Sequence, residues 1–307
     1  MGSIPKYLER NLNYLAATFP SRAKYLITDQ SDILWIKKLD FRVVRSEDLI
    51  PNWPEEFMIT DRRRHFRNNF WFSTKARLLL LPKFMRNEGI DRIIHVESDV
   101  WIHPNFPFNV FEGLNCDLAF PLVDEKRGIA STMFVRGEEG IAILENACRK
   151  WPESTDMEIL GKILASESGA LELASTYTNS NESLDGWIFD GAKLGMYLFG
   201  SDAKNSKGIV KRFSRSPMGD LSKSGRIMIE GDRLVLVREE SKLMIASLHI
   251  HSKNLRIFSN DWKRTVEFQL FKEQAKLSVS FDLKAFIYSM AEVMLRIFRK
   301  IGLFTER

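Results

Sequence analysis

Two carboxylates and two histidines stand in short, regularly spaced motifs that could bind a divalent metal ion. Glu97 and Asp99 form a Glu-x-Asp motif directly after the apolar run 93–96, and His249 and His251 form a His-x-His motif late in the chain. Mg²⁺ and Mn²⁺ are commonly held by one or two carboxylates together with substrate phosphates and water. The two motifs therefore predict a Mg²⁺ or Mn²⁺ centre, provided that the fold brings them together.

The acidic pair has a second interpretation, in which Ser98 and Asp99 cap a helix. The residues that follow, 100–103, give no helical continuation, and Pro104 disfavours a helical conformation at His103. We therefore expect Asp99 to bind metal rather than to cap a helix.

Both motifs require strands that end at the same place. The run 93–96 is rich in β-branched residues, which predicts a strand buried on both faces of a sheet, and in open α/β sheets ligands bind beyond the carboxyl ends of the strands. The stretch 247–255 forms the end of a second predicted strand, whose period of two places Ser247, His249, His251 and Lys253 on one face. A metal ligand and a phosphate-binding cation would then lie side by side.

The rest of the chain reads as alternating helices and strands. Helical spacing or capping predicts helices over 4–19, 70–81 (ended or kinked by Pro82), 138–149, 156–166 and 190–200. Apolar runs predict strands over 24–28, 41–44, 117–122 and 131–135 and a hairpin over 226–238. Two prolines predict a loop over 105–113, and the Lys-, Ser- and Gly-rich stretch 201–224 predicts a lid.

The order of the motifs resembles that of the GT-A superfamily of nucleotide-sugar-dependent glycosyltransferases. The resemblance covers roughly residues 23–258: the Glu-x-Asp motif, a Ser-containing strand over 130–135, Phe189-Asp190-Gly191 and the His-x-His-Ser-Lys motif. It implies an α/β fold with a GT-A-like Rossmann-type mixed sheet flanked by helices. It also implies a metal-dependent hexosyltransferase of the bacterial or viral polysaccharide-biosynthesis type, moving a sugar from a nucleoside diphosphate to a hydroxyl of a glycan or lipid-linked acceptor.

The resemblance also assigns roles around the metal. Asp99 falls at the carboxylate that binds the metal on the donor diphosphate, and Glu97 stands where the first Asp of the family motif is usual. The C-terminal metal-binding histidine maps to His251 or His249, with His251 preferred because it lies nearer to Lys253. The Lys253 ammonium would contact the diphosphate.

Further resemblance-based roles concern the donor and the acceptor. Asp190, and after it Asp185, falls where inverting members carry a catalytic base, although Asp190 also reads as an ordinary helix N-cap. Thr28 and Asp29 end the first predicted strand, where base and ribose bind in nucleotide-binding sheets; Asp29 could instead open a turn.

One basic residue of the 70–81 helix would approach the nucleotide, and Arg77 is the candidate. An exposed cation on an amphipathic helix is the simpler alternative for this residue. The cluster of basic residues over 62–67 is typical of a solvated face.

Composition bounds the domain count and the compartment. A chain of 307 residues with 44% hydrophobic content can bury a substantial core, and we expect a catalytic domain over 1–262 and a C-terminal helical extension over 263–307. Two cysteines, no signal-peptide core and no apolar run of about eighteen residues predict a cytoplasmic protein.

The C-terminal extension carries an apolar stripe with basic residues beside it, over 283–304. This pattern and the net charge of +5 predict that the protein associates peripherally with the anionic surface on the inner face of a membrane. Packing against the domain or a second subunit is the alternative. Nucleic acid is not expected as a partner, because the charge is not densely clustered.

Two other functions remain open from the sequence. The His-x-His pair with carboxylates could form the metal centre of a hydrolase, although such centres generally use more His or Cys ligands. A basic peripheral membrane or scaffold protein could also keep a transferase-like fold without turnover.

Overall fold

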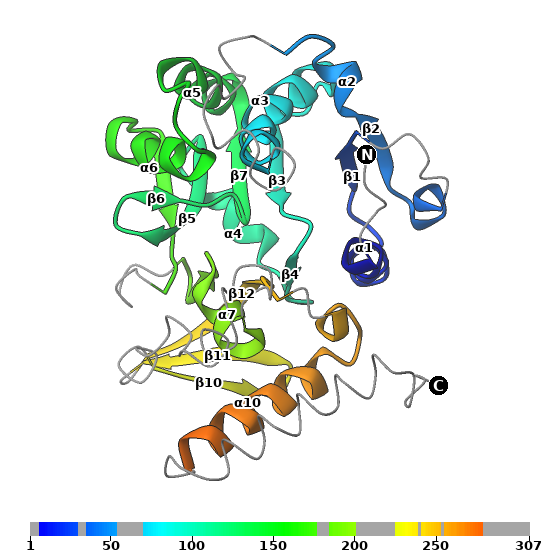
Figure 1. The fold of residues 1–307 in the computed structure, drawn as a ribbon, viewed down its shortest axis with the longest axis vertical. Coiled ribbons are helices and arrows are strands. Elements are labelled where there is room, and N and C mark those ends of the chain that lie inside the picture. Colours follow the sequence, from blue (N-terminus) through cyan, green and yellow to red (C-terminus); the bar gives the residue numbers. More distant parts are fainter. Residues whose placement is uncertain are drawn as a thin grey trace.

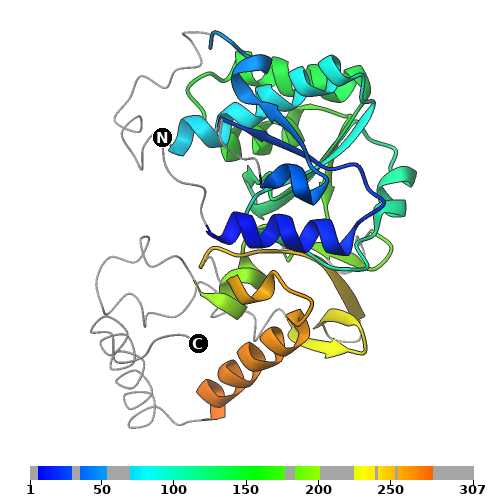
Figure 2. The same cartoon turned by 90° about the vertical axis from the view of Figure 1, so that its right-hand side faces the viewer.

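The computed structural model describes residues 6–29, 35–53, 70–176, 184–200, 225–238, 241–252 and 255–278. In Figure 1 these residues form an upper and a lower part, each built on a sheet of five strands. Figure 2, turned by 90°, shows helix α1 (Lys6–Thr18) lying along the junction of the two parts. The chain is therefore a mixed α/β protein whose two sheets meet at a seam.

The upper sheet has the strand order β3-β7-β5-β6, and β8 pairs with β5. Its pairs are antiparallel except for the parallel pair of β5 and β8. Three helices pack their apolar side chains into the core beside it, including Leu78, Phe84 and Leu144. These strands and helices are β3 (Arg92–Val96), β5 (Leu118–Asp124), β6 (Arg127–Gly128), β7 (Thr132–Arg136), β8 (Ala170–Leu173), α3 (Phe70–Glu88), α5 (Gly137–Lys150) and α6 (Asp156–Ser166).

The lower sheet has the strand order β10-β11-β12-β4, and β9 pairs with β12 in parallel. Tyr14 of α1, Trp262 and Val266 contribute buried side chains to its core. The elements of this part are β4 (Val100–Ile102), β9 (Trp187–Phe189), α7 (Lys193–Phe199), β10 (Arg226–Glu230), β11 (Arg233–Arg238), β12 (Ser241–His249), η5 (Leu255–Ile257) and α10 (Trp262–Ser278).

A parallel two-stranded sheet lies beside the upper part, on the right of Figure 1. The ring of Tyr25 packs against Phe84 of α3, with centroids 4.9 Å apart, while Leu26 packs against Leu12 of α1. Its strands and neighbouring turns are β1 (Tyr25–Thr28), η1 (Ile36–Leu39), β2 (Arg42–Arg45) and α2 (Ser46–Leu49).

Most predicted elements are confirmed, although the helix predicted over 190–200 begins only at Lys193 and β12 ends at His249, and three further details are wrong. Residues 108–113 form helix α4 (Phe108–Gly113) rather than a loop, because Pro107 precedes the first turn and interrupts no helical hydrogen bond. Helix α3 continues through Pro82 to Glu88, since Phe84 and Met85 beyond the proline are buried in the core. Strand β3 is only half-buried, because β7 is its only partner among the described strands.

The structure describes the chain on both sides of the predicted domain boundary between residues 262 and 263. Helix α10 begins at Trp262, next to the predicted boundary, and Trp262 and Val266 are buried in the lower core. The basic cluster 62–67, the predicted lid 201–224, Lys253 and the apolar stripe 283–304 lie outside the described residues. Among the described helices, none combines the length and the apolar character needed to cross a membrane.

His103, directly after β4, should make folding stability depend on pH. Its ring is 1% exposed, packs against Trp262 with centroids 5.2 Å apart, and accepts a hydrogen bond from Asn105 N–H through Nδ1. Burial lowers the pKa of His103 to about 4, against about 6.5 for an unfolded chain. Between these values the unfolded state binds a proton that the folded state does not, so stability falls as pH falls below 6.5, by about 2 kcal/mol at pH 5.

The measurement is thermal unfolding between pH 8 and pH 5. His103→Phe keeps an aromatic ring in the core but removes the titrating group, so its melting temperature should fall less with decreasing pH than that of the wild type. Equal slopes for the two proteins would contradict this account of His103.

Candidate metal centre

The Glu-x-Asp motif forms the turn by which the chain passes from the upper sheet to the lower one. Glu97 directly follows β3, and Val100 N–H donates to Glu97 O at 3.0 Å, closing the turn at the start of β4. Glu97 N–H donates to Ser131 O at 3.1 Å, which ties the turn to the upper sheet. Both carboxylates therefore lie at the seam.

The end of β12 runs beside this turn. Strands β4 and β12 are antiparallel, with His249 opposite Val100, and Ile250 N–H donates to Asp99 O at 2.8 Å. These backbone contacts bring one histidine of the His-x-His motif to the Glu-x-Asp motif, across about 150 residues of sequence. They place His249, rather than His251, beside the carboxylates.

Three side chains then converge on one point. His249 Nε2 lies 3.5 Å from Asp99 Oδ2 and 3.7 Å from Glu97 Oε2, and one ligand atom from each residue lies within 4.8 Å of the others. Ligands about 2.1 Å from one octahedral ion are about 3 to 4.2 Å apart, and the two separations from His249 Nε2 fall within this range. The 3.5 and 3.7 Å separations are too long for direct hydrogen bonds.

The histidine presents a lone pair to the carboxylates. Its Nδ1 lies 3.0 Å from Gly191 O, and a carbonyl oxygen only accepts, so Nδ1 carries the proton and the neutral ring has its lone pair on Nε2. Within the described part of the chain, Glu97 Oε2 is buried without a hydrogen-bond partner. With Nε2 unprotonated, these three atoms could share one cation as ligands, and a backbone carbonyl that orients the imidazole is typical of metal sites.

Arg77 holds the other oxygen of Glu97. Its guanidinium donates to Glu97 Oε1 and, at 2.9 Å, to Asp156 Oδ2, while its Nε donates to Thr74 O at 2.6 Å. Burial alone would raise the pKa of Glu97, but the neighbouring Arg77 guanidinium, through its charge and its hydrogen bond, lowers that pKa below its usual value. Arg77 thus keeps Glu97 ionised and turns Oε2 toward Asp99 and His249. These contacts engage the guanidinium that was predicted to approach a nucleotide.

Asp190, the first candidate base, is a buried anchor for the same strand. It is 0% exposed, and its carboxylate accepts backbone N–H groups from Leu194 at 3.0 Å, Gly195 at 2.7 Å and His249 at 3.1 Å. Burial raises the pKa of Asp190, while the N–H donors act against that increase. A Cβ on Gly195 would lie 2.0 Å from His249 O, so glycine permits this close approach of α7 to β12.

Removing the Asp190 carboxylate should therefore destabilise the protein. Asp190→Ala would leave three buried N–H groups without acceptors, at a cost of about 3 kcal/mol or more, whereas Asp190→Asn keeps one acceptor oxygen and should cost less. Denaturant unfolding measures both. If Asp190→Ala is as stable as the wild type and loses only turnover, Asp190 would instead be a catalytic base.

Three other predicted site residues are His251, Asp185 and Lys253. The ring of His251 stacks on that of His249, with centroids 4.1 Å apart. Asp185 is exposed in a left-handed conformation, with φ of 49°, in the turn before β9, whereas Asp190 follows the other end of that strand. Lys253, the proposed diphosphate contact, lies outside the described residues.

The predicted donor-binding residues lie on the separate two-stranded sheet. Thr28 ends β1 opposite Arg45, and Asp29 follows it as an exposed residue. Neither belongs to the cluster formed by Glu97, Asp99 and His249.

Two residues near the cluster, Asp156 and Thr132, were not identified from the sequence. Asp156 lies in the first turn of α6, where a capping box of Thr155 and Glu158 marks the helix start but does not indicate its contact with Arg77. Thr132 donates to Ser247 Oγ at 3.1 Å and joins the two sheets at the seam. Such contacts depend on tertiary packing.

No protein-family model, curated protein or solved structure matches this chain. Inference about function therefore starts from the metal centre and from the order of the motifs.

Proposed function

We propose that this protein is a metal-dependent glycosyltransferase, moving a sugar from a nucleoside-diphosphate donor to a hydroxyl of a glycan or lipid-linked acceptor. The observation that carries the proposal is the convergence of Glu97 Oε2, Asp99 Oδ2 and the Nε2 lone pair of His249 at the seam between the sheets. The resemblance of the motif order to GT-A transferases supplies the reaction class.

The chemistry explains why these residue types would converge. Transfer breaks the bond between the anomeric carbon and phosphate, so negative charge grows on the leaving diphosphate as the sugar becomes oxocarbenium-like. A bound Mg²⁺ or Mn²⁺ supplies Lewis-acid stabilisation of that charge. In this proposal Glu97, Asp99 and His249 hold the ion, and Lys253 contacts the diphosphate as a point charge.

Other residues of the chain position this set. Arg77 keeps Glu97 ionised and directs one oxygen to the site, and Asp190 fixes the backbone of His249. Thr28 and Asp29 remain the proposed contacts of the nucleoside. Because both Asp190 oxygens accept backbone N–H groups, we assign Asp190 to positioning.

The ligand set favours this function over a hydrolase. Two carboxylates and one imidazole suit Mg²⁺ or Mn²⁺, whereas catalytic zinc centres generally take more nitrogen or sulfur ligands. Among the described residues, the only group of His, Cys, Asp and Glu side chains close enough to share an ion is Glu97, Asp99 and His249.

The test is a thermal-shift screen of UDP, GDP, CMP and their sugars, each with and without Mn²⁺. A ligand that binds only the folded state raises the melting temperature. We expect one nucleotide to raise it in the presence of Mn²⁺ only, and its sugar donor to be hydrolysed slowly with Mn²⁺. Mn²⁺ binding without any nucleotide effect would favour the hydrolase, and no effect of either would favour a non-catalytic protein.

A further inference from the structure

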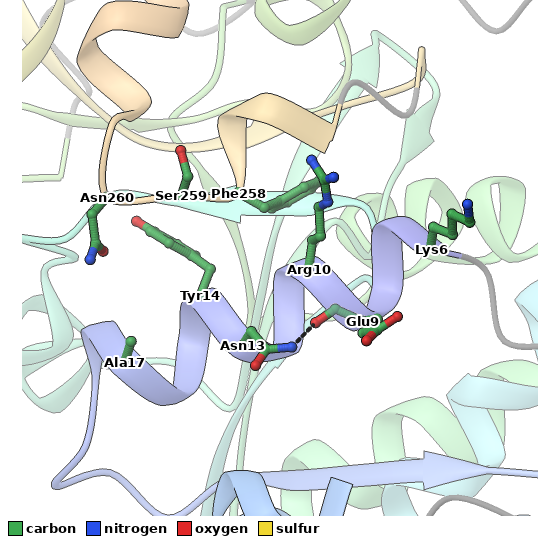
Figure 3. A pocket seen from close by; sticks show the side chains of 9 residues that line it. All are labelled: Lys6, Glu9, Arg10, Asn13, Tyr14, Ala17, Phe258, Ser259 and Asn260. Carbon is green, nitrogen blue, oxygen red and sulfur yellow. Dashed lines mark hydrogen bonds between the residues drawn. The ribbon is translucent and has the colours of Figure 1, made fainter. Parts of the chain in front are cut away.

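Helix α1 has a solvent-facing side and an anchored side. Figure 3 shows the first, where an open pocket separates α1 from the segment before α10. The pocket is lined by Lys6, Glu9, Arg10, Asn13, Tyr14, Ala17, Phe258, Ser259 and Asn260. On the anchored side, Tyr14 OH donates to Ile102 O at 2.8 Å, and Asn11 contacts the turn that bears the candidate metal ligands.

The amide of Asn11 brackets Asp99. Asn11 is 1% exposed, and its Nδ2 donates to Ser98 O at 3.0 Å and to Val100 O at 3.1 Å. These carbonyls belong to the residues immediately before and after Asp99. One side chain from the first helix therefore restrains the backbone on both sides of a candidate ligand.

The buried side chain of Asn11 makes two hydrogen bonds but also leaves one polar atom unsatisfied in the described part of the chain. Within the described residues, Asn11 Oδ1 is buried without a hydrogen-bond partner, and such an orphaned acceptor costs free energy. The first helix already packs through apolar side chains such as Leu12 and Leu15. A buried polar group that leaves one of its own atoms unsatisfied calls for another explanation, and here that is the restraint of the turn.

We propose that Asn11 is a positioning residue of the metal centre, so that docking of α1 and metal affinity are coupled. The proposal rests on the metal binding contained in the proposed function. With both flanking carbonyls held, Asp99 keeps the conformation that directs its carboxylate to His249. The coupling free energy is reciprocal: if docking of α1 strengthens metal binding, metal binding stabilises the docked position of α1 by the same amount.

The first test compares two substitutions on the same helix. Asn11→Ala and Tyr14→Phe each remove hydrogen bonding from α1 to the backbone around β4, but only Asn11 contacts the turn. We expect Asn11→Ala to raise the dissociation constant for Mn²⁺ about tenfold or more, the usual effect of losing a supporting contact, and Tyr14→Phe to leave it within about twofold. Titration monitored by the electron paramagnetic resonance of free Mn²⁺ measures both.

The second test needs no substitution and covers the case in which Asn11→Ala fails to fold. Saturating Mn²⁺ should slow amide hydrogen exchange in α1 of the wild type more than in α5, which carries none of the candidate ligands. Wild-type Mn²⁺ affinity in folded Asn11→Ala, or unchanged exchange in α1, overturns the coupling alone. Absence of Mn²⁺ binding by the wild type overturns the metal centre and the coupling together.

Discussion

Asp99→Asn is expected to weaken Mn²⁺ binding by about 100-fold or more and to abolish metal-dependent turnover. Loss of a contact that merely supports a ligand costs about 10- to 100-fold in metal affinity, so loss of the ligand itself should cost at least as much. The carboxylate of Asp99 lies 3.5 Å from His249 Nε2, and asparagine offers that site a neutral oxygen in place of an ionised one.

The same substitution should not unfold the protein. In the absence of metal, the Asp99 and Glu97 carboxylates face each other within one cluster, so neutralising one of them removes a repulsion. The backbone contacts of the turn, from Val100 N–H and Ile250 N–H, do not use the side chain. The melting temperature without metal should therefore stay near that of the wild type or rise slightly.

Asp91→Asn is the matched control for this experiment. Asp91 precedes β3 at the opposite end of the strand, and its side chain is 71% exposed. The Asp91→Asn substitution makes the same chemical change outside the candidate centre, so it should leave Mn²⁺ binding and turnover unchanged. Near-normal turnover of Asp99→Asn at modest Mn²⁺ concentration would show that Asp99 does not anchor the metal.

The sequence could indicate the ligand types but not the choice between the two histidines. The strand predicted from the sequence continues through His251, so its period of two places both histidines on one face and does not choose between them. The register of β12 against β4, in which His249 lies opposite Val100, decides between them. That register depends on tertiary packing, and β4 has three residues, too few for a clear strand signal.

Local elements were easier to predict than the contacts between them. The helices predicted over 138–149 and 156–166 lie within one residue of the bounds of α5 and α6, because helix formation depends on signals local in the sequence. Asn11 contacts residues 87 and 89 positions away, and no local pattern encodes such a pairing. Arg77 likewise reads as an exposed cation, yet its partners Glu97 and Asp156 come from two other parts of the fold.

His249→Ala should abolish the pH dependence of Mn²⁺ binding together with most of the affinity. Protons and the metal compete for the Nε2 lone pair of a ligating imidazole, so affinity for Mn²⁺ falls as the pH is lowered in the wild type. Without the imidazole, Glu97 and Asp99 remain, and the positive charge of Arg77 still lowers the pKa of Glu97 and keeps that carboxylate ionised over the range tested. Binding should be weaker by about 100-fold and nearly flat between pH 8 and pH 5.5.

His251→Ala is the comparison that gives this prediction its force. His251 was the histidine preferred from the sequence because it lies nearer to Lys253, and its ring stacks on that of His249 with centroids 4.1 Å apart. If its ring only supports the ligand by stacking, His251→Ala should weaken Mn²⁺ binding far less than His249→Ala and should keep the slope with pH. A flattened slope in His251→Ala, with a wild-type slope in His249→Ala, would assign the metal to His251. An unchanged slope in both variants would mean that neither histidine binds the ion, and the centre would then have to rest on carboxylates alone.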